Sequence, residues 1–126
     1  MITAVHTLIY AADPDAARAF FRDVLEFPGA DVGGGWLIFK TGPSELAVHP
    51  NAWEHEGRAG STAQRFDLSL MCDDLDATMA ELTAKGAKFG GDVVDQRWGR
   101  TVQLTVPGAG EMTLYQPKYD PPATSR

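Results

Sequence analysis

The sequence predicts a single α+β domain built from two copies of one βαβββ module. Two internal repeats support this prediction. An alternating stretch that begins at His6 leads into Asp-Pro-Asp-Ala at residues 13–16, and a similar stretch that begins at Asp67 leads into Asp-Leu-Asp-Ala at residues 74–77. Later, Glu-Leu-Ala-Val-His at residues 45–49 corresponds to Glu-Met-Thr-Leu-Tyr at residues 111–115. We therefore expect one domain over residues 1–126, with modules at about 1–50 and 66–117, a polar linker or flap at 51–65 and a frayed tail at 118–126.

Each module is expected to open with a strand and to continue with a helix whose ends are marked in the sequence. Asp13 is a suitable N-cap, because its carboxylate can accept hydrogen bonds from the first turn, and proline at 14 suits the first helical position. Pro28-Gly29 ends this helix. In the second copy Asp74 is the N-cap, and Lys85-Gly86 supplies a basic last turn and a glycine stop. Further strands follow each helix, most clearly at 36–41, 45–49, 101–106 and 111–115.

One helix per module must cover one face of the sheet, and strand alternation decides which residues face it. In the second copy Leu68, Leu70 and Cys72 are expected to face the helix, together with Met112 and Leu114. The other face then carries polar and aromatic side chains: His6, Tyr10, Trp36, Glu45, His49, Asp67, Ser69, Gln103, Glu111, Thr113 and Tyr115. Such a mixed surface is typical of a small-molecule pocket, and an open antiparallel sheet with one wet face is the alternative.

Composition and charge disfavour several classes of partner. The net charge is −6, and no run of Lys and Arg occurs, so neither a nucleic acid nor an anionic membrane is an expected partner. No apolar run reaches the roughly 18 residues of a membrane span, and we expect a cytoplasmic protein. The single cysteine, Cys72, excludes an intramolecular disulfide and is expected to be an inert core thiol. Neither a serine–histidine–aspartate arrangement nor a dinucleotide or phosphate-binding glycine motif is present.

The stretch from His6 to Phe27 resembles the opening of the vicinal oxygen chelate superfamily of glyoxalases, bleomycin-resistance proteins and extradiol dioxygenases. It combines a first-strand histidine, an Asp-X-Asp helix start and a Phe-Phe-X-X-Val-Leu-Glu-Phe turn, with Phe21 and Glu26 in place of the usual Tyr and Gly. Residues 73–77, 85–86, 107–108 and 114–117 are similar to the second half of the family. The resemblance covers nearly the whole chain and is specific for fold. It implies a cupped mixed sheet with helices on its outer face, closed within one chain or by exchange with a partner chain, and a homodimer.

The resemblance also bears on metal binding. Metal-dependent members hold one divalent ion with ligands from the first and last strands of each module. The first-strand positions are His6 and Asp67, and the last-strand positions, which carry Glu in those members, are Ala47 and Thr113. Because alanine cannot bind an ion and threonine is a poor ligand for one, we expect no tightly bound cofactor.

A displaced and weaker metal site is the alternative. Glu45 and Glu111 face the same way as Ala47 and Thr113 but lie two residues earlier, about 6.6 Å along the strand. A set of His6, Asp67 and Glu111, completed by Glu45 or His49, would suit a weakly held divalent ion. The same carboxylates could instead line the mouth of the cup without an ion.

We therefore expect a protein that binds a small organic molecule in the cup between its modules. The candidate ligand-binding residues are Tyr10, Trp36, His49, Trp98, Gln103 and Tyr115. The two tryptophans would supply flat walls for a planar ligand, and Trp53 in the linker would serve as a lid. The incomplete metal set favours binding or sequestration without catalysis. Metal-dependent catalysis by a lyase, isomerase or dioxygenase is one alternative, and metal-free catalysis by Glu111, whose pKa a closed pocket would raise, is the other.

Overall fold

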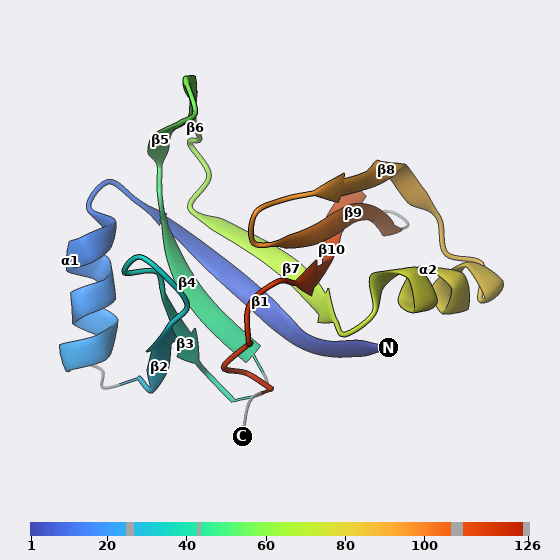
Figure 1. Ribbon diagram of the computed structural model, residues 1–126, viewed down its shortest axis with the longest axis horizontal. Coiled ribbons are helices and arrows are strands. Elements are labelled where there is room, and N and C mark those ends of the chain that lie inside the picture. The colour runs from blue at the N-terminus through green and yellow to red at the C-terminus, as the bar shows by residue number, and fades with distance from the viewer. Residues whose placement is uncertain (25–26, 43, 107–109, 125–126) are drawn as a thin grey trace.

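The computed structural model describes residues 1–24, 27–42, 44–106 and 110–124. These residues form one mixed eight-stranded sheet, two α-helices and a separate two-stranded hairpin (Figure 1). The strand order in the large sheet is β2-β3-β4-β1-β7-β10-β9-β8. The predicted α+β class is therefore confirmed.

Both halves of the chain follow the expected βαβββ order. The first contains β1 (Ile2–Ala11), α1 (Pro14–Ala19), a π-helical turn η1 (Phe20–Val24), β2 (Gly29–Asp31), β3 (Leu37–Lys40) and β4 (Ser44–Pro50). The second contains β7 (Phe66–Cys72), α2 (Leu75–Ala84), β8 (Phe89–Asp95), β9 (Gly99–Val106) and β10 (Gly110–Pro117). Between them, β5 (Ala52–His55) and β6 (Arg58–Ser61) form the hairpin.

Both helices begin where the sequence places their caps. The Asp13 carboxylate accepts a hydrogen bond from the Ala16 N–H at 3.0 Å, and the Asp74 carboxylate accepts one from the Ala77 N–H at 3.0 Å. Gly86 follows α2 with φ of +94°, in the left-handed region that glycine enters without strain. No helix among the described residues is long and apolar enough to cross a membrane.

The strand register makes the two halves equivalent. β1 is parallel to β4, β7 is parallel to β10, and β1 and β7 meet antiparallel at the centre of the sheet. His6 lies level with Glu45 on β4 and with Ser69 on β7, and Thr113 on β10 is level with Ser69. The parallel register that joins Ser69 to Thr113, continued by two residues, places Asp67 level with Glu111, as His6 is with Glu45.

The outer face of the second half is an apolar core beneath α2. Cys72, Leu75, Val102 and Leu114 are buried together, and Leu70, Met79 and Leu82 pack against them. Leu70, Cys72 and Leu114 therefore face the helix as predicted. Leu68 lies near the other end of β7 and is 44% exposed, so α2 does not cover it. Burial raises the pKa of the Cys72 thiol, as expected for an inert core cysteine.

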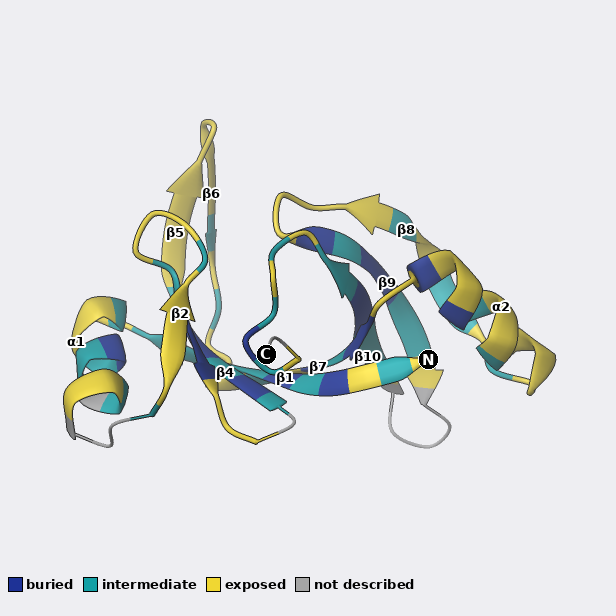
Figure 2. Cartoon of the chain, turned by 60° about the horizontal axis from the view of Figure 1, so that its bottom comes forward, coloured by how far each residue is buried: buried dark blue, intermediate teal, exposed yellow. Residues whose placement is uncertain are grey.

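The inner face is covered by the end of the chain, which was expected to be frayed. That expectation is wrong as far as Thr124, the last residue described. Tyr119 and Ala123 pack against a second buried cluster of Ala4, Met71 and Tyr115. Figure 2 shows this segment passing between the two halves of the cup. The Tyr119 and Ala123 side chains bury apolar area against this cluster. The free energy gained by that burial offsets the conformational entropy that the tail loses on becoming ordered.

The linker is also more ordered than a polar loop would be. The turn of the β5–β6 hairpin contains Glu56 and Gly57, whose φ angles are +52° and +75°. Two successive positive φ angles are characteristic of the tight turns whose twist matches that of the paired strands. The hairpin projects away from the large sheet beside the first half (Figure 1).

Candidate functional site

A buried carboxylate lies on the inner face of the sheet, next to a histidine. His6 on β1 and Glu45 on β4 occupy level positions of parallel strands and point to the same face. The His6 Nδ1 atom lies 2.7 Å from Glu45 Oε1, and the two residues are only 6% and 1% exposed. Because an ionised carboxylate only accepts hydrogen bonds, His6 donates through Nδ1. Its Nε2 atom then remains as the second polar atom of the ring.

Two groups from the C-terminal segment also donate to Glu45. The Tyr119 hydroxyl donates to Oε1 at 2.9 Å, and the Ala123 N–H donates to Oε2 at 3.4 Å. The Tyr115 and Tyr119 hydroxyls lie 2.7 Å apart. Burying a carboxylate costs free energy unless hydrogen bonds replace those it made to water. Here His6, the Tyr119 hydroxyl and the Ala123 N–H replace them. We call His6, Glu45, Tyr115 and Tyr119 the carboxylate centre.

Both tyrosines of the carboxylate centre are neutral in the folded protein. Burial raises the pKa of Tyr119 and of Tyr115 well above the ordinary value of about 10, and the nearby negative charge of Glu45 adds to the rise in each case. Each phenol therefore keeps its proton at neutral pH and can both donate and accept a hydrogen bond.

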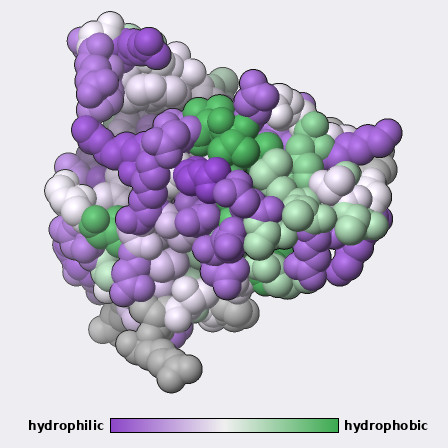
Figure 3. All heavy atoms as spheres, turned by 45° about the vertical axis from the view of Figure 1, so that its right-hand side comes forward, coloured by the Kyte–Doolittle hydropathy of each residue, from purple (hydrophilic) through white to green (hydrophobic). Residues whose placement is uncertain are grey.

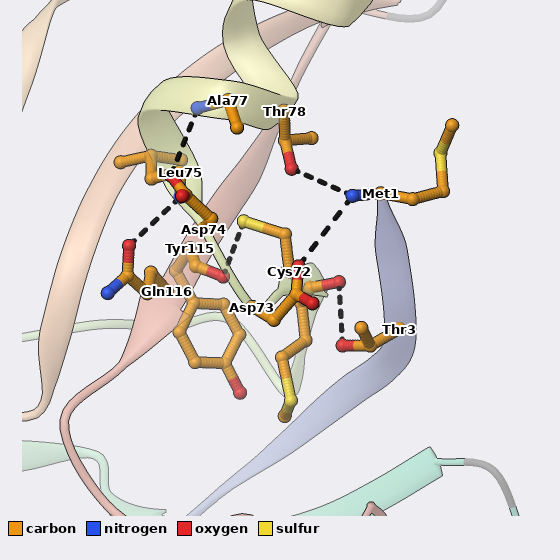
Figure 4. A network of polar contacts seen from close by, with 11 residues as sticks. Met1, Thr3, Cys72, Asp73, Asp74, Leu75, Ala77, Thr78, Tyr115 and Gln116 are labelled. Atoms are coloured by element: carbon orange, nitrogen blue, oxygen red, sulfur yellow. Dashed lines mark hydrogen bonds and ion pairs between the residues drawn. The ribbon is translucent and has the colours of Figure 1, made fainter.

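Tyr115 is fixed in position from the side of α2. Its backbone carbonyl accepts a hydrogen bond from the Cys72 thiol at 3.4 Å, and the side chain of the next residue, Gln116, accepts one from the Leu75 N–H at 2.9 Å. In Figure 4 the Tyr115 ring points away from α2 and its polar contacts. The first turn of α2 thus helps to hold the phenol that faces the cup.

A separate group of rings surrounds His49 at the end of β4. The ring centroids of Tyr10, Trp36 and Trp53 lie 5.7, 5.3 and 5.3 Å from that of His49, each in an edge-to-face arrangement. His49 Nδ1 donates to the Pro50 carbonyl at 2.8 Å, since a carbonyl can only accept. We call Tyr10, Trp36, His49 and Trp53 the aromatic cluster.

The predicted ligand-binding residues divide between these two places. Tyr10 and His49 are each four residues along their strands from His6 and Glu45, which corresponds to about 13 Å. Tyr10, Trp36 and His49 therefore lie in the aromatic cluster, whereas Tyr115 belongs to the carboxylate centre. Trp98 is near Tyr115, with ring centroids 5.3 Å apart.

The remaining candidates lie outside both groups. The Gln103 side chain donates to the Thr113 hydroxyl at 3.0 Å on the β9–β10 side of the sheet. Glu111 is exposed, and its carboxylate lies against Gly90 of β8. Asp67 accepts a hydrogen bond from the Tyr10 hydroxyl at 3.4 Å, and burial together with this carboxylate raises the pKa of Tyr10.

Comparison with known proteins decides the family. The family model described as the Glyoxalase/Bleomycin resistance protein/Dioxygenase superfamily matches residues 3–112. The chain belongs to this superfamily. No curated protein matches the chain in sequence. The fold and the family that the sequence resembled are therefore confirmed, and the site has to be interpreted within this superfamily.

Solved structures with the same fold carry different activities in their descriptions. Methylmalonyl-CoA epimerase from Mycobacterium tuberculosis is 16% identical, with a TM-score of 0.60, over 92% of this chain and 89% of that one. The Streptomyces coelicolor epimerase in complex with 2-nitronate-propionyl-CoA is 19% identical, with a TM-score of 0.59, over 94% and 99%. A structure described as an NAD-dependent benzaldehyde dehydrogenase from Legionella pneumophila is 15% identical, with a TM-score of 0.60, over 90% and 99%. At such identities the likeness establishes the fold and leaves the reaction open.

Of the four positions that hold the metal ion in metal-dependent members of the superfamily, only those of His6 and Asp67 carry good ligands. Among the residues that the structure describes, no three His, Cys, Asp and Glu side chains are grouped so that they could hold a metal ion. His6 and Glu45 lie together, but they bond to each other, and Glu45 also accepts hydrogen bonds from the tail. In the second module, the residue that corresponds to His6 is Asp67, which accepts a hydrogen bond from Tyr10. The residue that corresponds to Glu45 is Glu111, which is exposed. Among the described residues, these donors do not surround a common point at which three of them could hold an ion, so the set present does not fit a resident ion.

Sequence reasoning missed Tyr119, which completes the carboxylate centre. The signal available was a tyrosine and two prolines in a segment that was otherwise polar. Nothing in the local pattern shows that Tyr119 reaches Glu45, because the two residues are 74 positions apart in the chain.

Proposed function

We propose that this superfamily member binds a small organic molecule in the cup of its sheet, with the carboxylate centre as the polar anchor. The observation that carries the proposal is the burial of the His6–Glu45 pair beside the apolar and aromatic cluster of Ala4, Met71 and Tyr115. Burying a carboxylate on a strand costs stability compared with an apolar residue there, and sequences depart from such rules chiefly at functional sites.

A cavity adjoins the carboxylate centre through Tyr119. It has a volume of about 380 Å³ and is also lined by Thr3, Met71 and Pro121, whereas His6 and Glu45 lie behind Tyr119 and do not line it. That volume falls within the range of about 300–1,000 Å³ that is typical of small-molecule sites. A few convergent polar groups in a mainly apolar hollow are the usual composition of such sites.

The three tryptophans allow a sharp test of where a ligand binds. Trp98 lies beside the carboxylate centre, whereas Trp36 and Trp53 belong to the aromatic cluster. A library of small aromatic and carbonyl compounds is screened for those that raise the melting temperature, and the fluorescence change on binding is then measured for each hit. We expect Trp98→Phe to remove that change, and Trp36→Phe and Trp53→Phe to preserve it.

Matched glutamate variants provide the control. Glu45→Gln should weaken binding by about tenfold or more, because it removes the charge from a buried hydrogen-bonded anchor. Glu111→Gln, an equal change at an exposed position, should leave the affinity unaltered. Hits that perturb only Trp36 and Trp53, or a screen without hits on either the wild-type chain or the variants, would count against the proposal.

A second candidate is metal-free proton transfer, and the His6–Glu45 hydrogen bond favours it. A base whose orientation is fixed by a neighbouring group is the arrangement that proton-transfer sites use. Glu45 is better placed for this role than Glu111, which is exposed and lies against Gly90 of β8. Deuterium exchange at the carbon next to a carbonyl of any bound hit, measured by NMR, tests it. Exchange that is no faster than in Glu45→Gln would exclude it for that compound.

We also propose that the chain forms a homodimer, as the superfamily resemblance implies. Phe66 and Leu68, two positions apart on β7, are 63% and 44% exposed on the outer face. Neighbouring exposed apolar side chains often mark an interface. Sedimentation equilibrium of the wild-type chain and of Leu68→Glu measures this, and a monomeric wild-type chain would contradict the proposal.

A further inference from the structure

The C-terminal segment is bonded to Glu45 in the way that a bound molecule would be. Tyr119 contributes an aromatic ring against Met71 and Tyr115 and a hydroxyl between Glu45 Oε1 and the Tyr115 hydroxyl. Ala123 contributes an N–H to the other carboxylate oxygen. Apolar contact with a ring, together with hydrogen bonding at its para position, is the recognition that a small phenol requires.

The segment is anchored at its base independently of the carboxylate centre. At the base, the Lys118 N–H donates to the Trp98 carbonyl at 2.9 Å, and the Lys118 ammonium lies 2.6 Å from the Asp95 carboxylate. Pro121 and Pro122 then follow, and proline has no N–H with which to join the sheet. Thr124 bonds locally, to the Pro121 carbonyl at 3.1 Å. Beyond its base, Tyr119 and Ala123 bring the segment to both oxygens of Glu45.

We propose that residues 119–124 are an internal occupant of the ligand site, and that the site takes a phenol or a similarly neutral aromatic hydroxyl compound in place of Tyr119. This inference rests on the proposed function and names the ligand class and its competitor. The incoming hydroxyl donates to Glu45 Oε1 and accepts a hydrogen bond from the Tyr115 hydroxyl, as the Tyr119 hydroxyl does. An aromatic carboxylate is disfavoured, because it would bring a second negative charge to Glu45.

Competition predicts how binding changes when the occupant is weakened without creating a cavity. Tyr119→Phe keeps the ring and removes only its hydrogen bond to Glu45. Loss of a hydrogen bond to a charged group weakens an interaction by about tenfold or more, so the segment should be displaced more readily. The probe is 4-methylphenol, which has the structure of the tyrosine side chain, and toluene, which lacks the hydroxyl, is its control. Dissociation constants are obtained from NMR titrations of the full chain.

We expect 4-methylphenol to bind Tyr119→Phe about tenfold more tightly than it binds the wild-type chain. Tyr10→Phe, which removes a tyrosine hydroxyl from the aromatic cluster, should bind it as the wild-type chain does. In the wild-type chain, the probe should also speed hydrogen exchange of the Ala123 amide while leaving that of Leu114 unchanged. Toluene should bind every variant at least about tenfold more weakly than 4-methylphenol.

The possible failures point to different parts of the argument. Equal affinity of 4-methylphenol for Tyr119→Phe and the wild-type chain would overturn the competition, while the ligand site itself would stand. Equal affinity for toluene and 4-methylphenol would overturn the ligand class. If 4-methylphenol bound neither chain while hits from the screen perturbed Trp98, the ligand class would again be wrong and the proposed function would survive. Absence of all binding near Trp98 would remove the proposed function, and this inference with it.

Discussion

At the scale of single residues, the carboxylate centre departs most from what local rules favour. The two-residue period of a strand places Glu45 on the same face as Ala47, which is completely buried. A glutamate at such a position is tolerated because His6, Tyr119 and the Ala123 N–H satisfy its oxygens. The equivalent Glu111 is exposed. Corresponding carboxylates of the two modules therefore differ in burial: Glu45 is buried and Glu111 is exposed.

The two tyrosines of the carboxylate centre predict how stability depends on alkaline pH. The folded-state pKa values of Tyr115 and Tyr119 are raised above the unfolded value of about 10, mainly by burial, and the charge of Glu45 adds to the rise. A raised pKa means that the folded state holds the proton more tightly. Its contribution to stability is therefore fully present below about pH 10 and is lost as the pH rises further, towards the folded-state values.

We expect the free energy of unfolding to fall above about pH 10 and to fall less steeply in Tyr119→Phe, which has one such phenol fewer. Urea unfolding at several pH values between 8 and 11 measures this. Cys72 also has a raised pKa, but it is present in both chains and cancels in the comparison. Parallel curves for the two proteins would show that Tyr119 is not buried as described.

At the scale of elements, the sequence predicts correctly the features that depend on neighbouring residues, namely the helix caps and the faces of the strands. Asp13 and Asp74 cap the two helices as expected, and the period of two places Leu70, Cys72 and Leu114 under α2. The same alternation puts His6 and Glu45 on one face, although the sequence alone does not reveal that their strands are in parallel register.

The elements that were missed depend on contacts between distant parts of the chain. The tail is ordered through Glu45 and Trp98, and neither partner is visible in the composition of residues 118–126. Strand alternation puts Tyr10 on the same face as His6, but four residues of β1 separate the two side chains. A shared face therefore did not amount to a shared site.

A matched pair of leucines tests how α2 covers the sheet. Leu114 is completely buried in the core beneath α2, whereas Leu68, on the same outer face, is 44% exposed. Leu114→Ala should lower the free energy of unfolding by about 2–5 kcal/mol, because it leaves a cavity in a packed core. Leu68→Ala, measured at a concentration at which the chain is monomeric, should lower it by less than about 1 kcal/mol. Urea denaturation measures both, and similar losses would mean that the core beneath α2 is described wrongly.

At the scale of the whole molecule, the two halves form a symmetric frame around an asymmetric interior. The first half supplies His6 and Glu45, and the second supplies Met71, Tyr115 and the base of the C-terminal segment that lies between them (Figure 2). The outer surface is different in character. On the side that carries α2 and β8, apolar patches are interrupted by hydrophilic side chains (Figure 3), in keeping with a net charge of −6. The features that bear on ligand chemistry are thus concentrated in the cup.

The last prediction concerns divalent ions, because the superfamily fold can hold one and this chain has an incomplete donor set. Protein purified without chelator should contain far less than one ion per chain. His6 and Glu45 are the two donors that lie together, and the tail occupies both oxygens of Glu45. An added ion must therefore displace Tyr119 and Ala123, which makes any binding weak.

Titration with Mn²⁺, Ni²⁺ and Zn²⁺ while the melting temperature is followed measures this binding, since an ion that binds only the folded state raises it. We expect a small rise for the wild-type chain and a larger one for Tyr119→Phe, in which Glu45 has lost a competing donor. The rise should vanish in His6→Ala and persist in Glu111→Gln, since the Glu111 carboxylate lies against Gly90 of β8. A stoichiometric ion in the purified wild-type protein that is lost in His6→Ala would reverse the order of the proposed functions, because a resident ion at this centre would make metal-dependent catalysis the leading one.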